Sequence, residues 1–249
     1  MKLGLCQLKP AFERKTANRS RIARLLRRLP QAKKLDWLIF PEMTLTSFSM
    51  KPKLTTLSSE DIEFFADIAK QRSAFVSFGG VLKGCNRIIT LDRSGQQVSS
   101  YAKTHLFSRL KEERAYKPGA KTETFLLDGA RISPTVCFDL RFAYLYWNMG
   151  PKTDVFVNIA CWPTRREEHW LTLLRARAIE NLCFSVGVNR VGRDPDFEYC
   201  GRSAVFDPMG APVLVCGGKE GVFLADIDIA AVAQTRARLP FLKDRRPWR

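Results

Sequence analysis

Three polar residues of this sequence directly follow short apolar runs and together have the chemistry of nucleophilic catalysis. Glu42 follows Leu-Ile-Phe-Pro, Lys103 follows residues 98–102, and Cys137 follows residues 132–136. A thiolate can attack a carbonyl carbon, a carboxylate can carry the proton, and an ammonium group can stabilise the developing oxyanion. Each residue alone also has an ordinary explanation, as a helix-start acid, a solvated loop base or a buried thiol. The combination predicts a cysteine nucleophile that needs no cofactor.

The thiol requires activation, because a free cysteine with a pKa of about 8.5 is only slightly ionised at neutral pH. A nearby Lys103 would lower the pKa of the Cys137 thiol, and Glu42 can accept its proton. For an amide substrate, attack would leave a thioester, and Glu42 would protonate the departing ammonia and then activate water. We expect Lys103 and the backbone N–H of Phe138 to hold the oxyanion.

Cysteine and histidine usage argues against other common kinds of site. The seven cysteines are scattered without a Cys-x-x-Cys pair, which disfavours a disulfide framework and a zinc site. With only His105 and His169 available, we expect no metal and no cofactor. Cys161 also ends an apolar run, and we interpret it as a residue of the wall of the site or of the hydrophobic core. A papain-like pairing of a cysteine with His169 is an alternative, although no cysteine has papain-like flanks.

The elements that must position these residues alternate between short apolar strands and amphipathic helices. Helices are predicted around 22–29 and 170–178, and a third begins at a capping box formed by Ser58 and Asp61. The predicted strands are 3–8, 37–40, 75–82, 88–91, 98–102, 125–127, 132–136, 155–160, 184–188, 204–206, 213–216 and 222–227.

The strand order favours a layered α/β fold. Two strand pairs form hairpins, with turns at 93–95 and 128–129, so a purely parallel sheet fits poorly. The intervening helices exclude an all-β sandwich. We expect a mixed sheet, or two stacked sheets covered by helices. The 249 residues show no linker, so we predict a single domain over 1–249.

The formal net charge of +16 invites a nucleic-acid-binding hypothesis. The basic residues are diffuse, however, and the cluster at 21–28 fits the wet face of a helix. No RNA-recognition, zinc-finger or KH signature is present, so a basic binding module is an alternative only. No apolar run reaches the roughly 18 residues of a membrane span, and the first residues lack the core of a secretory signal. We expect a cytoplasmic protein that does not enter membranes.

At the three polar residues the sequence resembles the nitrilase, or carbon–nitrogen hydrolase, superfamily. The matching segments are 40–42 (Phe-Pro-Glu), 101–107 (Tyr-Ala-Lys-Thr-His-Leu-Phe) and 136–142 (Val-Cys-Phe-Asp-Leu-Arg-Phe), in the family's order. Further similarity at 158–163, 169–170, 176–181, 189–192, 203 and 207–210 extends over nearly the whole chain. The Trp-Pro with His-Trp pairing and segment 112–119 look most like the omega-amidase branch.

The resemblance implies specific expectations for fold, site and substrate. It implies a four-layer αββα sandwich that pairs into homodimers, with Glu42, Lys103 and Cys137 catalytic. The family's fourth carboxylate maps onto Glu112, with adjacent Glu113 as the alternative register. It further implies release of ammonia from 2-oxo-acid amides such as 2-oxoglutaramate and 2-oxosuccinamate.

Other branches of the same superfamily are alternatives to an omega-amidase. A nitrilase, an N-carbamoyl hydrolase and an acyl transferase would all keep the three residues. Phe138 and Tyr144 stand where Tyr and Glu are common in the family, which bears on substrate choice more than on the chemistry. Arg141 could bind a substrate carboxylate or pair structurally with Asp139 or another acid, and we do not assign it to the site.

Overall fold

The computed structural model describes residues 1–30 and 34–246 of the chain. Within these residues the strands form two six-stranded sheets and one small hairpin. The first sheet consists of β1 (Lys2–Gln7), β2 (Trp37–Ile39), β3 (Phe75–Leu82), β4 (Cys85–Leu91), β5 (Gln97–Ala102) and β14 (Gly221–Asp226). The second consists of β6 (Phe125–Leu127), β7 (Ala130–Val136), β8 (Val155–Ala160), β9 (Phe184–Asn189), β12 (Ala204–Phe206) and β13 (Pro212–Val215). The small hairpin is β10 (Val191–Arg193) with β11 (Glu198–Cys200).

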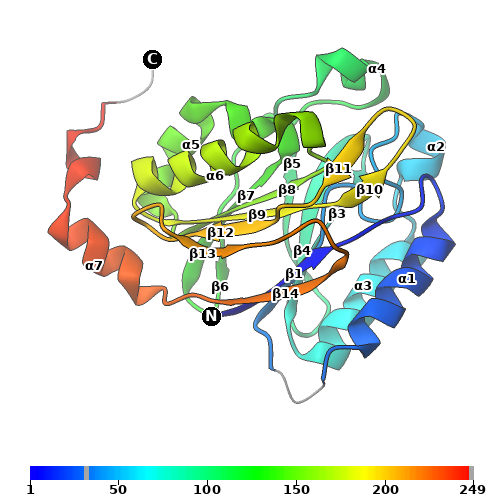
Figure 1. The fold of residues 1–249 in the computed structure, drawn as a ribbon, viewed down its shortest axis with the longest axis horizontal. Coiled ribbons are helices and arrows are strands. Elements are labelled where there is room, and N and C mark those ends of the chain that lie inside the picture. The colour runs from blue at the N-terminus through cyan, green and yellow to red at the C-terminus, as the bar shows by residue number, and fades with distance from the viewer. Residues whose placement is uncertain (31–33, 247–249) are drawn as a thin grey trace.

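Helices cover the outer faces of the two sheets (Figure 1). The α-helices are α1 (Lys15–Arg27), α2 (Pro52–Thr55), α3 (Ser59–Arg72), α4 (Glu112–Ala115), α5 (Ala143–Met149), α6 (Glu167–Asn181) and α7 (Ala230–Arg238). The 3₁₀ turns are η1 (Ser108–Leu110), η2 (Cys137–Arg141), η3 (Gly150–Lys152), η4 (Thr164–Arg166) and η5 (Phe241–Asp244). α1 and α3 lie against the first sheet, whereas α6 packs on β9 and β12 of the second with α5 beside it. This arrangement gives four layers in the order helix, sheet, sheet, helix.

Both sheets are mixed, with three parallel strands at the centre. β1, β2 and β3 run parallel, and β14, β4 and β5 add antiparallel strands at the edges. β7, β8 and β9 are parallel in the second sheet, where β6, β12 and β13 are antiparallel. The predicted hairpins β4–β5 and β6–β7 are both present. The β10–β11 hairpin and the short helices were not predicted.

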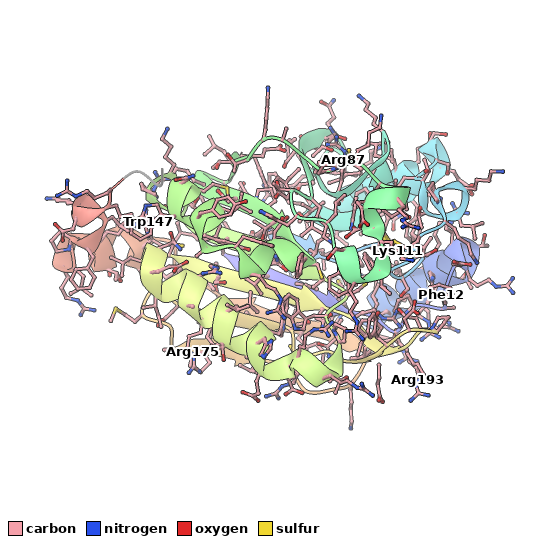
Figure 2. All side chains as sticks on the ribbon, turned by 90° about the horizontal axis from the view of Figure 1, so that it is seen from above. Phe12, Arg87, Lys111, Trp147, Arg175 and Arg193 are labelled. Atoms are coloured by element: carbon pink, nitrogen blue, oxygen red, sulfur yellow. The ribbon has the colours of Figure 1, made fainter. Side chains whose placement is uncertain are left out.

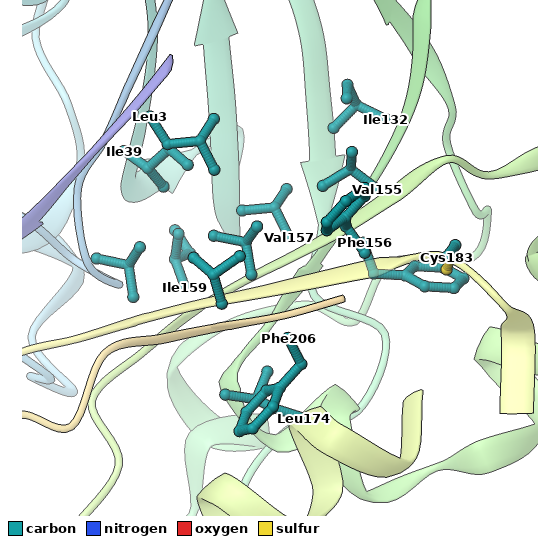
Figure 3. Close-up of a cluster of buried hydrophobic side chains, with 14 of the residues drawn as sticks. Leu3, Ile39, Ile132, Val155, Phe156, Val157, Ile159, Leu174, Cys183 and Phe206 are labelled. Carbon is teal, nitrogen blue, oxygen red and sulfur yellow. The ribbon is translucent and has the colours of Figure 1, made fainter. Parts of the chain in front are cut away.

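β2 illustrates how a short apolar strand holds the layers together. Trp37 and Ile39 point into the core between the two sheets, whereas Leu38 and Phe40 join the cluster under α1 and α3. Alternate residues of a strand face opposite sides, so a strand buried on both faces is apolar throughout. In Figure 3, Ile39 from this strand lies in the same buried cluster as Val157 of β8. The strand end that precedes Glu42 is therefore fixed from both sides.

The predicted capping box opens α3. The Ser58 hydroxyl accepts from the Asp61 N–H at 3.2 Å, and the Asp61 carboxylate accepts from the Ser58 N–H at 3.0 Å. Two N–H groups that the helix cannot satisfy internally thus gain partners.

The basic side chains are distributed over the molecule. Figure 2 shows Arg87 of β4, Arg175 of α6 and Arg193 of β10 on different sides of the molecule. Among residues 1–30 and 34–246, no helix is both long and apolar enough to cross a membrane. The charge therefore does not form the single basic stripe that is typical of a nucleic-acid-binding domain.

Candidate active site

The structure brings Glu42, Lys103 and Cys137 together from three strand ends. Glu42 follows β2 and Lys103 follows β5 in the first sheet, while Cys137 follows β7 in the second. β4 and β5 pack against β7, so the two sheets meet at this point. Lys103 Nζ lies 3.1 Å from Glu42 Oε1, and the negative charge of Glu42 raises the pKa of the Cys137 thiol.

Cys137 has an unusual backbone conformation. Its φ of 46° lies in the left-handed region, which costs energy for residues other than glycine. β7 ends at Val136, and the 3₁₀ turn η2 begins at Cys137 itself. The chain therefore turns sharply at Cys137, as it does at strand-to-helix turns that expose a reactive side chain in other enzymes. The N–H of Phe138 lies in the first turn of η2, where a helix leaves N–H groups without internal partners.

Glu42 is 1% exposed and is held by several donors. Its Oε1 accepts from Asn86 Nδ2 at 2.8 Å and from Lys103 Nζ at 3.1 Å. Its Oε2 accepts from the backbone N–H of Cys161 at 2.8 Å. Buried carboxylates are stable when hydrogen bonds and opposite charge replace water. Glu42 is thus fixed beside the Cys137 thiol.

Lys103 forms a second ion pair with Glu112 of α4. Lys103 Nζ lies 2.8 Å from Glu112 Oε2 and 3.1 Å from Oε1, and both side chains are completely buried. The Phe107 N–H also donates to Glu112 Oε2 at 2.6 Å. Burial by itself lowers the pKa of Lys103, but the charges of Glu112 and Glu42 outweigh it and hold that pKa well above its ordinary value. Lys103 is therefore a permanent cation.

The structure distinguishes Glu112 from Glu113, the two candidates for the fourth carboxylate. Glu112 faces Lys103, whereas Glu113 is exposed on the outer side of α4. Consecutive residues of a helix point about 100° apart, so only one of the two can enter the site.

Asn86 belongs to the site and was missed by the sequence analysis. Its Nδ2 donates to Glu42 Oε1 at 2.8 Å and to Glu112 Oε1 at 3.0 Å. Asn86 thus links the two carboxylates that flank Lys103. The register of the predicted β4–β5 hairpin could have located it, because Arg87 pairs with Ala102 and the next pair is Asn86 with Lys103.

Asp139 is the second residue that the sequence analysis did not assign to the site. Its Oδ2 accepts from the Val136 N–H at 3.1 Å and the Tyr101 hydroxyl at 2.8 Å. Its Oδ1 accepts from the His105 N–H at 2.8 Å and lies 2.8 Å from His105 Nδ1. Asp139 therefore ties the segment around Lys103 to the turn that carries Cys137. These bonds also remove Asp139 as an ion-pair partner for Arg141.

The charge state of Cys137 differs from the sequence-based expectation. Burial raises the pKa of the Cys137 thiol and Glu42 raises it further, while Lys103 and the Cys161 N–H lower it. The net result is a pKa well above the ordinary value. The lowering by Lys103 was correctly anticipated, but burial outweighs it because a thiolate loses more hydration than a neutral thiol. This shift of the pKa favours the uncharged form of the Cys137 thiol.

A cavity of about 140 Å³ lies beside the thiol. Its wall is mainly aromatic and includes Phe48, Phe107, Phe138, Trp162 and Phe197. This volume is below the roughly 300–1,000 Å³ of pockets that hold drug-sized ligands, which favours a small ligand. The cavity thus favours a small substrate with an apolar middle.

Cys161 and His169 occupy supporting positions. Cys161 lines the cavity, and its backbone holds Glu42, as expected for a wall residue. His169 accepts a hydrogen bond at 3.2 Å from Arg141 and does not line the cavity that Cys137 lines. The contacts of Cys137 are with Glu42 and Lys103, so the papain-like alternative has no support.

The model of the carbon–nitrogen hydrolase family matches residues 2–237. This is nearly the whole chain. The protein belongs to the carbon–nitrogen hydrolase family. The family expected from the three sequence motifs is thereby confirmed.

Curated relatives of this carbon–nitrogen hydrolase include amidases. A 2-oxoglutaramate amidase of Bacillus subtilis is 32% identical over 224 residues, which is 86% of each chain. An omega-amidase of Escherichia coli K12, YafV, is 32% identical over 216 residues, which is 84% of each chain. These similarities identify the chain as an amidohydrolase of the family.

Solved structures confirm the fold of the hydrolase. The protein XC1258 of Xanthomonas campestris, a CN-hydrolase superfamily member with an arsenic adduct in its active site, is 31% identical with a TM-score of 0.93. The alignment covers 100% of this chain and 98% of that one. Nit3 of Saccharomyces cerevisiae, a nitrilase superfamily member, superposes with a TM-score of 0.88 at 21% identity, covering 99% and 96% of the two chains. The α/β class with two mixed sheets between helices is therefore confirmed.

Two departures from the common family pattern have structural consequences in this hydrolase. Phe138 lines the cavity and packs edge-on against Phe107, with ring centroids 5.2 Å apart. The Tyr144 hydroxyl contacts His105 Nε2, on the opposite side of the ring from Asp139. Both aromatic residues therefore contribute to the wall and its support rather than to the cluster around Lys103.

Proposed function

We propose that this hydrolase is a cysteine amidase that releases ammonia from short 2-oxo-acid amides, with 2-oxoglutaramate and 2-oxosuccinamate as candidate substrates. The observation that carries the proposal is the buried cluster of Glu42, Lys103 and Glu112 in contact with the Cys137 thiol. The amidase names of the relatives and the small volume of the cavity support the substrate class.

The first half-reaction forms a thioester. As Cys137 Sγ attacks the amide carbon, the thiol proton passes to Glu42. The thiol therefore reacts despite its raised pKa, because no free thiolate has to form beforehand. Lys103 and the N–H of Phe138 stabilise the negative oxygen of the tetrahedral intermediate. Glu42 then donates the proton to the departing nitrogen, so that ammonia leaves and the acyl group stays on sulfur.

The second half-reaction restores the enzyme. Water replaces ammonia, and Glu42 takes a proton from that water as it attacks the thioester carbon. When the intermediate collapses, the carbon–sulfur bond breaks and the proton returns to the Cys137 sulfur. Glu112 holds Lys103 in place throughout, so that the cation faces the oxyanion. The sum is one amide and one water converted into one acid and one ammonia.

The test is ammonia release from 2-oxoglutaramate and 2-oxosuccinamate, alongside a nitrile, a carbamoyl amine and a simple amide. We expect turnover of the two oxo-acid amides and its complete loss in Cys137→Ala. Lys103→Met should cost about a hundredfold to a thousandfold in kcat, the typical loss for one oxyanion donor.

Other outcomes would contradict the proposal in distinct ways. Mutant-sensitive turnover of nitriles or carbamoyl amines alone would place the enzyme in another branch, and transfer to an added amine would identify an acyl transferase. Undiminished turnover in Cys137→Ala would overturn the mechanism. Absence of all turnover, with nucleic-acid binding that survives physiological salt, would favour a binding module.

We also propose that the enzyme works as a cytoplasmic homodimer. A nucleophilic thiol that must stay reduced suits a reducing compartment. Ile179 of α6 is 48% exposed, packs against Gly210 and lies near Met209, which is 49% exposed. Contact between two copies at this face would bury both side chains.

A further inference from the structure

A second thiol lies beside Cys137. Cys161 follows β8, and its side chain lines the same cavity as the side chain of Cys137. Cys161 is 5% exposed, and neither cysteine is part of a disulfide. Cys161 Sγ donates a hydrogen bond to the backbone carbonyl of Glu42 at 3.4 Å. The proposed hydrolysis uses the backbone N–H of Cys161 to hold Glu42 but gives the sulfur no task.

The register of two parallel strands places the two cysteines next to each other. β7 pairs with β8 so that Val136 lies opposite Ile159, and the turn η2 that begins at Cys137 packs against β8. Cys137 directly follows Val136, and Cys161 follows Ile159 by two positions. Strands about 4.8 Å apart and an offset of one residue, about 3.3 Å, give a Cα separation of roughly 6 Å. Disulfides join residues whose Cα atoms are about 4.4–6.8 Å apart, so these strand ends hold the cysteines within reach of a bond.

The electrostatics of the two thiols agree with this proximity. Burial and the charge of Glu42 raise the pKa of both thiols well above the ordinary value. Smaller effects pass between the two residues, because the Cys161 N–H lowers the pKa of Cys137 and the charge of Cys137 raises that of Cys161. Glu42 Oε2 accepts from the Cys161 N–H at 2.8 Å, so one carboxylate lies beside both cysteines.

We propose that Cys137 and Cys161 form a reversible oxidation site, in which a hydroperoxide converts Cys137 to a sulfenic acid and Cys161 then closes a disulfide. In the first step the Cys137 sulfur attacks one oxygen of hydrogen peroxide and the O–O bond breaks. The thiol proton passes through Glu42 to the departing oxygen, which leaves as water, and the sulfur keeps a hydroxyl group. In the second step the Cys161 sulfur attacks the Cys137 sulfur and the S–O bond breaks. The hydroxyl leaves as water with the Cys161 proton.

The disulfide protects Cys137 from permanent damage. A second peroxide converts a sulfenic acid into a sulfinic acid, which thiols do not reduce. Cys161 outcompetes that second attack because it is already held beside the sulfenic acid, so that the reaction is intramolecular. A dithiol such as dithiothreitol reduces the disulfide and restores both thiols. This inference goes beyond the proposed function, since it does not depend on which amide the enzyme hydrolyses.

The first experiment locates the bond in the unaltered enzyme. Protein treated with hydrogen peroxide is denatured in the presence of iodoacetamide and digested with trypsin without reduction. Cleavage after Lys and Arg gives the peptides 132–141 and 153–165, which contain Cys137 and Cys161 as their only cysteines. We expect one linked species, lighter than the two peptides together by two hydrogen atoms, that dithiothreitol separates. Cys137 found only as sulfinic or sulfonic acid, or linked to a different cysteine, would overturn the proposal.

Cys161→Ser removes the second sulfur and keeps a donor for the Glu42 carbonyl. Each protein is treated with peroxide until Cys137 no longer reacts with iodoacetamide after denaturation, and is then reduced with dithiothreitol. Labelling of Cys137 should return to its starting level in the unaltered enzyme and stay lost in Cys161→Ser. In that variant the peptide 132–141 should gain two oxygen atoms, the mass change of a sulfinic acid. Equal recovery in the two proteins would contradict the role of Cys161.

The matched control is Cys216→Ser. Cys216 is also buried, but it does not line the cavity, so its removal takes away a thiol elsewhere in the fold. Labelling of Cys137 in this variant should recover as fully as in the unaltered enzyme. A loss of recovery equal to that in Cys161→Ser would indicate a general effect of a missing buried thiol and would overturn the assignment to Cys161.

Turnover gives a separate readout that distinguishes this inference from the proposed function. If the enzyme hydrolyses 2-oxo-acid amides, their turnover should fall with peroxide and return with dithiothreitol in step with the labelling of Cys137. If no amide is hydrolysed but the linked peptides form, the oxidation site stands and the amidase assignment is wrong. If amides are hydrolysed and no linked peptides form, the amidase stands and the oxidation site is wrong.

Discussion

The Cys137 thiol is kept uncharged by the groups that surround it. Burial and the adjacent Glu42 raise its pKa, and Lys103 only partly offsets them. Lys103 itself is committed to Glu42 and Glu112 through contacts of 2.8 to 3.1 Å. A neutral thiol reacts slowly with stray electrophiles, and under the proposed mechanism Cys137 gives its proton to Glu42 only as it attacks a bound substrate. The proposed reaction therefore depends on proton transfer from Cys137 to Glu42 during the attack on the substrate.

This charge balance predicts an unusual pH profile for alkylation. Because the folded-state pKa of the thiol lies above its ordinary value, the thiolate is disfavoured until higher pH. The rate of Cys137 alkylation by iodoacetamide should keep rising above about pH 8.5, where an ordinary thiol titrates. Glu42→Gln removes a negative charge and should shift the profile to lower pH. Glu113→Gln, an exposed acid outside the site, is the control. A plateau below neutral pH in the unaltered enzyme would contradict this prediction.

At the scale of elements, the site depends on the junction between β7 and η2. The chain turns at Cys137 with a left-handed φ of 46°, and Asp139 holds this turn through the Val136 N–H. The same carboxylate binds Tyr101 and His105 on either side of Lys103. One fully buried side chain thus joins the strand end of the first sheet to that of the second. Strained turns persist only where surrounding bonds fix them.

Replacement of Asp139 by Ala should therefore affect stability and activity together. Each buried donor left unpaired costs about 1–3 kcal/mol, so we expect a loss of at least about 3 kcal/mol. That corresponds to a fall in Tm of roughly 6–12 °C for a chain of this size. Thermal unfolding and kcat are the measurements. Asp207→Ala, which removes two backbone bonds from a turn outside the site, should lower Tm less and leave kcat unchanged.

Loss of the capping box of α3 is predicted to lower stability without changing activity. Ser58→Ala removes the acceptor for the Asp61 N–H and should cost about 1 kcal/mol. Tm should fall by about 2–4 °C, with kcat and KM unchanged. Ser59→Ala, at the exposed neighbouring position, is the control. A matching fall in kcat would mean that α3 influences the site, contrary to its place on the outer face.

At the scale of the whole molecule, the cavity lies where strand ends of the two sheets meet. The first sheet supplies Glu42 and Lys103, and the second supplies Cys137. Their inner faces form one hydrophobic core, in which Leu3 and Val157 belong to the same cluster (Figure 3). Packing of the sheets thus fixes the distance between Glu42 and Cys137, since close-packed cores resist small displacements.

A charged substitution on the exposed face of α6 tests whether two copies of the chain associate. Ile179→Glu should convert a dimer into a monomer in analytical ultracentrifugation, because an unpaired charge in an apolar interface is costly. Leu126→Glu, at the 65% exposed Leu126 of β6, is the control and should leave the mass unchanged. A monomeric unaltered enzyme would refute the homodimer.

The sequence by itself determined the strands of the two six-stranded sheets, the hairpins β4–β5 and β6–β7, and the residues of the motifs. Short continuous apolar runs and turn residues are local signals, so the strands around Trp37 and Val157 and the turn at 128–129 were predictable. Glu42, Lys103 and Cys137 were recognisable because each follows such a run and all three match one family's motifs. Glu112 was narrowed to one of two adjacent acids.

Only the tertiary structure decided which side chains from different segments contact one another. Burial of Cys137 comes from both sheets at once, so the direction of its pKa shift could not follow from one neighbouring lysine. Asp139 and Asn86 act through partners on other strands, and such bonds leave no local pattern in a sequence. The selection of Glu112 over Glu113 depends on which face of α4 meets Lys103. These are long-range contacts, and a long-range contact exists only after the chain has packed.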